Sequence, residues 1–335
     1  MKIFVTHIQR KKTFFFSVEN VFSNLRISLI KSNSVVINLK YAKFPSIGFF
    51  KRVGNFIDLW GLKSDIYHIL GDIHYVALVF DRRKTILTIL DCVSLYNSSK
   101  VKRTILFIFW YYIPVLWVKN ITVISESVKQ ELIKLTSCDP NKIKVIPCCI
   151  SPAFYNEKYV KPFNEGKPII LQIGTTPNKN IEVVSEAISQ INCILYIIGK
   201  LTDIQEQHLK NCNVEYKNFI NLTENQLIDV YCQSDILLFA STYEGFGLPI
   251  IEANALGLPV ITSNISSMPE VANDAAFLIN PLSSDEIIKA IVKIKEDRLL
   301  REKLVYNGFI NASKYSTDVI ASQFENYYLE VFSKV

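Results

Sequence analysis

The sequence predicts an α/β protein in which two Rossmann-like domains face each other across a cleft. Short apolar segments bounded by polar residues alternate with segments whose apolar residues recur at helical spacing. This pattern is typical of parallel sheets covered by helices. Glycine follows several of the apolar segments, at Gly71, Gly174 and Gly199. The chain of 335 residues also exceeds what one ordinary core accommodates and suits two domains.

We expect the first domain to span residues 1–154 and a polar linker with Pro and Gly to occupy residues 155–166. A helix is predicted over residues 17–30, because its apolar residues fall on one face. The apolar run at residues 104–118 includes Pro114 and is too short to span a bilayer, so it predicts a buried or interfacial helix. The predicted strands of this domain are residues 2–8, 34–39, 65–70 and 85–91.

The second domain is predicted to span residues 167–315, and a final helix is predicted over residues 316–335. The domain opens with an apolar strand, a turn at Gly174 and an amphipathic helix. Lys179 and Asn180 lie where that turn meets the helix, so the lysine could reach a phosphate held by the helix N-terminus. The other predicted elements are strands at residues 193–200, 213–219 and 234–240 and helices at residues 223–232, 285–294 and 298–315.

Charge is distributed unevenly along the chain. Residues 1–150 contain 22 Lys and Arg and 9 Asp and Glu, a net charge of +13, whereas the remainder has −7 and the whole chain +6. A basic half favours an anionic membrane face or a phosphate-bearing acceptor. Nucleic acid is the competing partner, but the chain has no nucleic-acid-binding motif and its second half is acidic, so we expect none. The alternative is that these lysines are simply solvated.

Cysteine and histidine usage argues against a metal site. The seven cysteines form no C-x-x-C pair, and the chain has only four histidines. Reduced, mostly buried thiols indicate a cytoplasmic protein. The N-terminal segment has too short an apolar core for a signal peptide. We therefore expect a cytoplasmic protein, peripheral at the inner face of the membrane, that uses neither a metal nor another cofactor.

The turn after residues 234–240 is the strongest candidate for a ligand site. Gly245 and Gly247 allow backbone conformations that other residues resist, and Pro249 suits the first position of a helix. A helix that starts just past the carboxyl end of a strand offers free N–H groups and the positive end of its dipole. Such a site suits a phosphate or pyrophosphate.

Two carboxylates flank this turn, at Glu244 and Glu252. Glu252 is expected in the first turn of the helix, facing the crevice, where a carboxylate accepts hydrogen bonds from hydroxyls such as those of a ribose. Taken singly, either residue has a simpler explanation. Glu252 would complement the helix dipole, and Glu244 would be a solvated loop residue.

The two glutamates, separated by the seven residues GFGLPII, resemble the motif of retaining GT-B glycosyltransferases, in particular glycosyltransferase family 4. Residues 259–281 are similar to the same family, and weaker similarity extends over most of the chain. The resemblance implies transfer of a sugar from a nucleoside-diphosphate sugar to an acceptor bound by the first domain. It also implies that the final helix, residues 316–335, crosses back to the first domain.

The resemblance also implies a donor site. Glu252 would bind the ribose, Glu244 would lie beside the donor sugar, and Lys179 would contact the diphosphate. The turn backbone would contact sugar and pyrophosphate. The remaining expected donor-site residues are Gly174, Thr175, Asn180, Gly199, Gly245, Phe246, Gly247 and Leu248.

The chain departs from the family pattern in the first domain. Family members commonly have a His-Asp pair at a strand end where this chain has Leu90 and Asp91. Asp91 is expected to line the acceptor pocket, because it follows a predicted strand. His74 is a candidate substitute for the missing histidine, although a lone histidine is more often structural. Many relatives also have an Arg near Gly174, so Lys179 would neutralise the diphosphate without it.

These observations predict a retaining glycosyltransferase that acts on a saccharide or lipid-linked saccharide in cell-surface polysaccharide biosynthesis. We expect metal-independent activity, because the chain has no D-x-D motif. The absence of G-x-G-x-x-G after a strand argues against a nicotinamide-dependent enzyme. Two alternatives stay open at this point: a GT-B nucleotide-sugar epimerase, and a catalytically silent protein that binds nucleotide-sugars.

Overall fold

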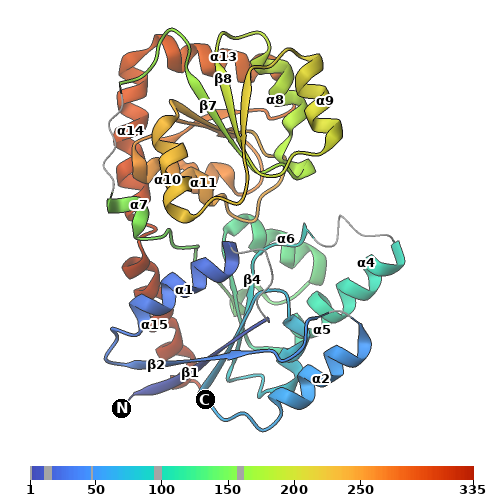
Figure 1. Ribbon diagram of the computed structural model, residues 1–335. Coiled ribbons are helices and arrows are strands. Elements are labelled where there is room, and N and C mark those ends of the chain that lie inside the picture. The colour runs from blue at the N-terminus through green and yellow to red at the C-terminus, as the bar shows by residue number, and fades with distance from the viewer. Residues whose placement is uncertain (1, 11–16, 47, 94–99, 157–161) are drawn as a thin grey trace. The chain divides into compact units, whose positions relative to one another are not determined.

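The computed structural model describes residues 2–10, 17–46, 48–93, 100–156 and 162–335. The chain divides into two compact units (Figure 1). Unit 1 comprises Met1–Cys149 and Thr317–Val335, and unit 2 comprises Ile150–Ser316. Each unit contains one six-stranded parallel sheet, which confirms the predicted α/β class. Part of the linker expected at residues 155–166, residues 157–161, lies outside the described residues.

The sheet of unit 1 has the strand order β2-β1-β3-β4-β5-β6. Its central strands are buried on both faces, which explains their nearly continuous apolar sequence. The strands are β1 (Ile3–Gln9), β2 (Val35–Tyr41), β3 (Ile66–Leu70), β4 (Thr85–Ile89), β5 (Asn120–Val123) and β6 (Ile143–Val145). The helices are α1 (Ser17–Leu29), α2 (Phe49–Leu59), the 3-10 helix η1 (His74–Val79), α4 (Lys100–Leu106), the π-helix η2 (Phe107–Tyr112), α5 (Ile113–Trp117), α6 (Glu126–Thr136), the 3-10 helix η3 (Pro140–Lys142) and α15 (Thr317–Ser333).

Unit 1 differs from the sequence predictions in two elements. Helix α2 was not predicted; it buries Asn55 and Leu59 and exposes most of its other apolar residues to solvent. The single helix expected at residues 104–118 is a continuous run of α4, η2 and α5, with the π-helix at its aromatic centre. Among the helices that the structure describes, none has the length and apolarity to span a membrane.

A buried chain of hydrogen bonds links α15 to the sheet of unit 1. The hydroxyl of Tyr328 lies 2.9 Å from Nε2 of His7 and 2.7 Å from Nδ1 of His68. Nε2 of His68 lies 2.6 Å from the hydroxyl of Thr88, which contacts Thr122 at 2.6 Å. Figure 1 shows α15 beside α1, in agreement with their packing. Burial lowers the pKa of His7 well below its ordinary value and that of His68 to about 3, so both rings are neutral in the folded protein.

We expect unit 1 to lose stability as the pH falls below about 6.5, the ordinary pKa of histidine. His7 and His68 stay neutral when folded but take up protons when unfolded, so acid favours unfolding. Each proton contributes a slope of about 1.4 kcal/mol per pH unit. Urea unfolding at several pH values, monitored by circular dichroism, measures this slope. The variant His68→Gln should show a slope shallower by about one proton, and an unchanged slope would contradict the assignment.

The sheet of unit 2 has the strand order β12-β11-β10-β7-β8-β9. The strands are β7 (Ile169–Ile173), β8 (Ile194–Ile198), β9 (Tyr216–Phe219), β10 (Ile236–Phe239), β11 (Val260–Ser263) and β12 (Phe277–Ile279). The helices are α7 (Ala153–Asn156), the 3-10 helix η4 (Pro177–Lys179), α8 (Ile181–Ile188), α9 (Asp203–Asn211), α10 (Glu224–Gln233), α11 (Leu248–Leu256), α12 (Met268–Ala272), the 3-10 helix η5 (Asn273–Ala275), α13 (Ser284–Glu296) and α14 (Arg298–Ser313).

The strand order of unit 2 reverses between β7 and β10. The chain proceeds from β7 to β8 and β9 on one side, and from β10 to β11 and β12 on the other. In open parallel sheets, the loops that leave two such strands at their carboxyl ends diverge and form a crevice that binds ligands. The fold of unit 2 therefore points to the loops after Ile173 and Phe239.

Candidate donor site

Hydrogen bonds tie the loops after β7 and β10 together. The N–H of Thr242 donates to the carbonyl of Asn178 at 2.8 Å, and Nδ2 of Asn178 donates to the carbonyl of Tyr243 at 2.9 Å. Asn180 is buried in the left-handed conformation, with φ of 60°. Its side chain donates to the carbonyl of Pro281 at 2.6 Å and to that of Ala240 at 3.3 Å. The two loops therefore form one preorganised surface.

Lys179 and Glu244 form an ion pair in this crevice. Nζ of Lys179 lies 2.5 Å from Oε1 of Glu244, and the two side chains are only 15% and 16% exposed. Asn178 donates to the same oxygen at 3.3 Å. The backbone of Glu244 is held as well, because its carbonyl accepts from the hydroxyls of Ser266 at 2.7 Å and Ser267 at 2.9 Å. The crevice thus holds a cation and an anion with restricted motion.

The aliphatic stem of Lys179 lies against Gly174. A Cβ atom at Gly174 would come within 2.7 Å of Cε of Lys179, and the φ of this glycine is +90°. Nζ lies 4.4 Å from the centre of the Phe239 ring, and the side chain of Gln172 donates to the backbone carbonyl of Lys179 at 2.9 Å. The need for glycine at position 174 follows directly, since any side chain would push the ammonium group out of place.

Two more glycines are required by their surroundings. Gly199 has a φ of +135°, and a Cβ atom there would meet Cγ2 of Thr175 at 2.9 Å. The hydroxyl of Thr175 donates to the carbonyl of Lys200 at 2.7 Å, which closes the loops after β7 and β8. Gly247 has a φ of +117° and precedes α11. These positions lie at the same edge of the sheet as Lys179 and Glu244.

The N-termini of α8 and α11 both open at this edge. Neither helix has a hydrogen bond from a side chain at its N-cap, where Asn180 and Gly247 stand. Pro is present in the first turn of α11. Free N–H groups and the positive ends of two helix dipoles therefore adjoin Lys179, and this is a physical basis for binding a diphosphate.

Glu252 lies in the second turn of α11, so the expectation that it occupies the first turn is wrong. The helix starts at Leu248, one residue before Pro249, which places Glu252 fifth. Its Oε2 accepts a hydrogen bond from the hydroxyl of Tyr231 at 2.6 Å. Burial raises the pKa of Glu252 to about 7, whereas the Tyr231 hydrogen bond and the charge of Lys179 act in the opposite direction. Near neutral pH this carboxyl group can therefore either donate or accept a proton.

We expect Glu252→Gln to gain stability relative to the wild type as the pH rises from about 4.5 to 7. The raised pKa means that the folded state retains a proton that the unfolded state has lost, so ionisation disfavours folding. The difference between the two proteins should reach on the order of 3 kcal/mol above pH 7. Parallel denaturant titrations at pH 5 and pH 8 measure it. Equal pH dependence of the two proteins would show that the Glu252 pKa is not raised.

The two candidates in unit 1 lie in different environments. Oδ1 of Asp91 accepts from the N–H of Val93 at 3.0 Å, just after β4, and the side chain is partly buried. His74 is buried and its Nδ1 donates to the carbonyl of Trp110 at 2.8 Å. Burial lowers the pKa of His74, so the ring is neutral. These contacts are those of a structural histidine, and the catalytic roles of both residues stay predictions.

Sequence reasoning did not identify the residues that support the site. Asn178 connects the loops after β7 and β10, Ser267 ties the segment after β11 to the carbonyl of Glu244, and Tyr231 positions Glu252 from a neighbouring helix. Phe246 is a related case, because its ring is buried against Tyr315 and only its backbone is left to face the crevice. Asn178 could have been identified from the sequence as a short polar residue close to a glycine turn. Nothing in the local sequence identifies Tyr231 as a partner of Glu252, because the two residues are 21 positions apart.

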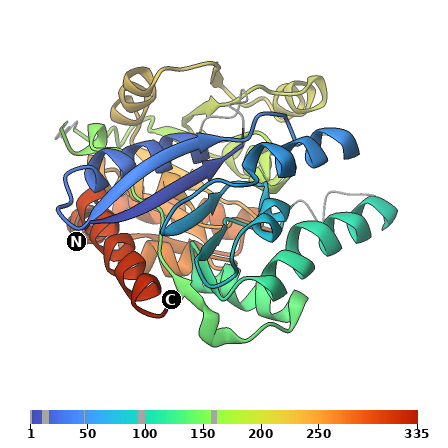
Figure 2. The ribbon, with the colours of Figure 1, turned by 90° about the horizontal axis from the view of Figure 1, so that it is seen from below.

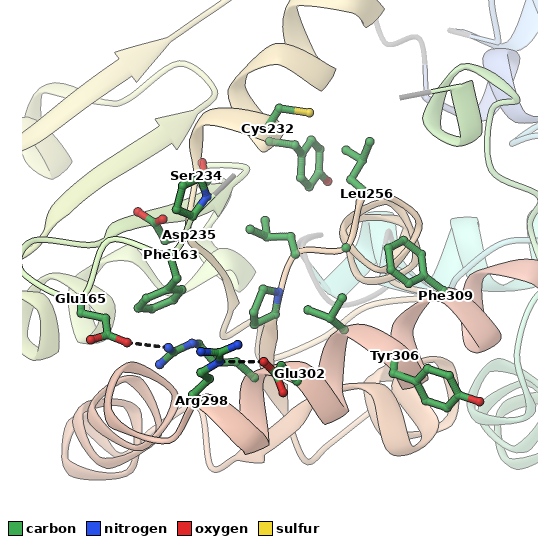
Figure 3. A pocket seen from close by; sticks show the side chains of 17 residues that line it. Phe163, Glu165, Cys232, Ser234, Asp235, Leu256, Arg298, Glu302, Tyr306 and Phe309 are labelled. Atoms are coloured by element: carbon green, nitrogen blue, oxygen red, sulfur yellow. Dashed lines mark hydrogen bonds and ion pairs between the residues drawn. The ribbon is translucent and has the colours of Figure 1, made fainter. Parts of the chain in front are cut away.

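A cavity of about 650 Å³ lies at the opposite edge of the same sheet (Figure 3). Its lining includes Ser234 and Asp235, which precede β10, and Pro259, which precedes β11. Figure 3 shows apolar side chains around it and the ion pairs of Arg298 with Glu302 and of Glu165 with Arg301. Tyr231 lines this cavity and also contacts Glu252. The cavity is not the site formed by Lys179 and Glu244.

Residues 155–310 match the family described as "Glycosyl transferases group 1". The O-antigen chain mannosyltransferase RfbU of Salmonella typhimurium is 24% identical over 267 residues, which is 77% of this chain and 72% of that protein. Three further curated relatives align over 59%, 26% and 17% of their own lengths. The matched family segment covers the whole candidate donor site.

Solved structures share the fold over the entire chain. A glycosyltransferase from Rickettsia africae ESF-5 superposes with a TM-score of 0.77 and 18% identity, covering 100% of both chains. Anabaena Alr3699/HepE, solved in complex with UDP and glucose, has a TM-score of 0.75 and 14% identity and covers 99% of this chain and 100% of that one. At these identities the likeness shows the fold alone.

Proposed function

We propose that this chain, whose residues 155–310 match the group 1 glycosyl transferases, is a GT-B glycosyltransferase that moves a hexose from a nucleoside-diphosphate sugar to a saccharide acceptor with retention at the anomeric carbon. The single observation that supports this most strongly is the Lys179–Glu244 pair between two uncapped helix N-termini. A relative that acts on O-antigen chains, together with the basic first half, favours an acceptor in surface polysaccharide biosynthesis.

Electrostatic stabilisation of the leaving diphosphate is the main contribution we propose for the protein. Negative charge grows on the diphosphate as the bond to the sugar breaks. Lys179 and the N–H groups at the starts of α8 and α11 would stabilise this charge. Little reorganisation would be needed, because the side chain of Lys179 is already held against Gly174 and Phe239. Glu244, paired with the same ammonium, would then lie beside the sugar.

Glu252 is proposed to select the ribose. Its ionised carboxylate would accept hydrogen bonds from the two ribose hydroxyls, while the Tyr231 hydroxyl keeps it oriented. Because the pKa of Glu252 is about 7, this task depends on pH in the neutral range. The carboxyl must be ionised to accept both hydroxyls, so donor affinity should decrease as the pH falls below 7.

The acceptor is proposed to bind unit 1, which contains Asp91 and most of the basic residues. A lipid-linked saccharide at an anionic membrane surface would explain the concentration of positive charge there. The enzyme would then work as a peripheral protein on the cytoplasmic face. No nucleic-acid partner is proposed.

A transfer assay tests the proposed reaction. The enzyme is incubated with ¹³C-labelled UDP- and GDP-hexoses and with octyl glycosides as saccharide acceptors, and the products are analysed by NMR. We expect a labelled glycoside whose anomeric configuration is that of the donor. An inverted product would refute retention. Conversion of the donor to an epimer without any glycoside would refute transfer and support the epimerase alternative.

We expect chelation of divalent ions to leave the transfer rate unchanged within about twofold. Lys179 and two helix N-termini supply the positive potential that a divalent cation gives the diphosphate in other enzymes. The measurement compares initial rates after dialysis against EDTA with rates after Mg²⁺ or Mn²⁺ is restored. A rate that is lost on dialysis and recovered with the metal would contradict the proposal.

A further inference from the structure

Helix α2 of unit 1 has polar as well as apolar contacts on its buried side. Leu59 is fully buried there, Asn55 bonds to both backbone groups of Phe44 at 2.9 and 3.0 Å, and Arg52 stacks on Trp110 with its guanidinium carbon 4.3 Å from the ring centre. Asp58 pairs with Lys40 at 3.1 Å. Polar contacts thus make up a large part of the attachment of α2 to unit 1, and most of the apolar residues of the helix lie on its other side.

The exposed face of α2 is apolar and aromatic. Its members are 73% exposed at Phe49, 87% at Phe50, 72% at Ile57 and 80% at Trp60, and Val53 lies between them. Positions 49, 53, 57 and 60 follow helical spacing, so they form one stripe along the helix, with position 50 beside it. Figures 1 and 2 both show α2 at the outer edge of unit 1. We call these five residues the α2 stripe.

An isolated exposed apolar residue needs no explanation, but a contiguous aromatic stripe of this size marks an interaction surface. Exposed lysines flank it in the sequence at Lys43, Lys51 and Lys63. Unit 1 as a whole contains 23 Lys and Arg and 12 Asp and Glu, a net charge of +11. Aromatic side chains exposed on one helical face, in a positively charged unit with lysines nearby in the sequence, are typical of helices that lie in a membrane interface.

We propose that the α2 stripe inserts into the interface of an anionic membrane, with the surrounding lysines on the lipid phosphates. The net positive charge of unit 1 favours an anionic membrane over a second copy of the chain as the partner. Two copies joined through the α2 stripe would bring two units of +11 together, whereas anionic lipid is attracted to both. The proposal deepens the membrane association given under Proposed function by naming the surface that makes it.

Vesicle binding tests the α2 stripe. The full chain is sedimented with vesicles of phosphatidylcholine, with and without about one-third phosphatidylglycerol, at low salt and at about 0.5 M NaCl. We expect binding that needs phosphatidylglycerol and weakens with salt. The double variant Phe50→Ser/Trp60→Ser should bind at least about tenfold more weakly. The matched control, Ile27→Ser/Ile30→Ser, removes exposed apolar residues from another part of unit 1 and should bind like the wild type.

Fluorescence gives an independent measurement at Trp60. Its emission should shift to shorter wavelength on anionic vesicles and be quenched by lipids that bear bromine on their acyl chains. Trp60→Phe keeps the apolar stripe, so it should retain binding but lose most of the shift. Wild-type binding by Phe50→Ser/Trp60→Ser would overturn the proposal, as would absence of vesicle binding in the wild type. A dimer that this variant dissociates would overturn it in favour of self-association.

The membrane proposal and the proposed reaction can be refuted independently of each other. The α2 stripe belongs to unit 1 and contains none of the donor-site residues, so Phe50→Ser/Trp60→Ser should transfer hexose to octyl glycosides at the wild-type rate. Normal vesicle binding without any sugar transfer would refute the reaction alone. Normal transfer without vesicle binding would refute the membrane surface alone.

Discussion

Replacing Lys179 by alanine is expected to lower kcat for sugar transfer by about 100- to 1,000-fold, the usual effect of removing one preorganised group that stabilises developing charge. The ammonium is 2.5 Å from Glu244 and its stem lies against Gly174, so its position is fixed by both contacts. Loss of Lys179 also leaves Glu244 partly buried without its ion-pair partner. Initial-rate kinetics with saturating donor measure the effect.

Lys210→Ala is the matched control for Lys179→Ala, because Lys210 lies in the last turn of α9 and is exposed. It should retain wild-type kinetics. Lys179→Arg should recover only part of the lost rate, since the close fit against Gly174 suits a lysine stem rather than a guanidinium. Near-normal kcat in Lys179→Ala, with the fold intact by circular dichroism, would remove this residue from the site.

The second large effect is expected from Glu252→Ala, which should weaken donor binding by about 10- to 100-fold. Hydrogen bonds to a charged group contribute about 1.5–3 kcal/mol, and the substitution also leaves the buried hydroxyl of Tyr231 without an acceptor. Isothermal titration with the preferred nucleoside diphosphate measures the loss directly.

Glu252→Gln separates charge from shape in this site. Wild-type affinity for the donor should increase as the pH rises through about 7, the pKa of Glu252, whereas the glutamine variant should show a flat profile. A wild-type affinity that is constant from pH 6 to 8 would show that the ionised carboxylate does not bind the ribose. Glu296→Ala, at the exposed C-terminal end of α13, serves as the control for loss of a carboxylate.

The donor crevice could be anticipated from sequence because local residues specify it. Gly245 and Gly247 with Pro249 predict a turn into a helix, and the short apolar runs predict the strands on either side. The sequence also shows a glycine, Gly174, at the end of a predicted strand. It does not show why glycine is needed there, which is that the side chain of Lys179 lies against this position.

Local sequence patterns could not predict the contacts between segments that are far apart in the chain. Lys179 and Glu244 are 65 residues apart and meet only because β7 and β10 are neighbours in the sheet. The same holds for the link of His7 to Tyr328, which are 321 residues apart. Glu252 was misplaced by one turn because α11 starts at Leu248 rather than Pro249, and one residue at a helix start decides which side chains occupy the first turn.

Helix α2 shows that apolar periodicity alone does not tell which face of a helix is buried. The pattern of Phe49, Val53 and Ile57 has the right spacing for a helix, but in an ordinary globular helix these residues would face the core. Here the core side contains Leu59 together with Asn55 and Arg52, and the hydrogen bonds and stacking of these two polar residues are visible only in three dimensions. A helix that violates the usual pattern is a stronger sign of an interface than a regular one.

Thermal stabilisation by a panel of UDP, GDP, ADP and CMP, each at millimolar concentration, tests the central claim most directly, because a ligand that binds only the folded state raises Tm. The account predicts that one nucleoside diphosphate raises Tm of the wild type and that Lys179→Ala and Glu252→Ala each reduce the shift. Phe50→Ser/Trp60→Ser should leave it unchanged. No shift with any of the four nucleotides, or a full shift in both donor-site variants, would contradict a donor site at Lys179, Glu244 and Glu252.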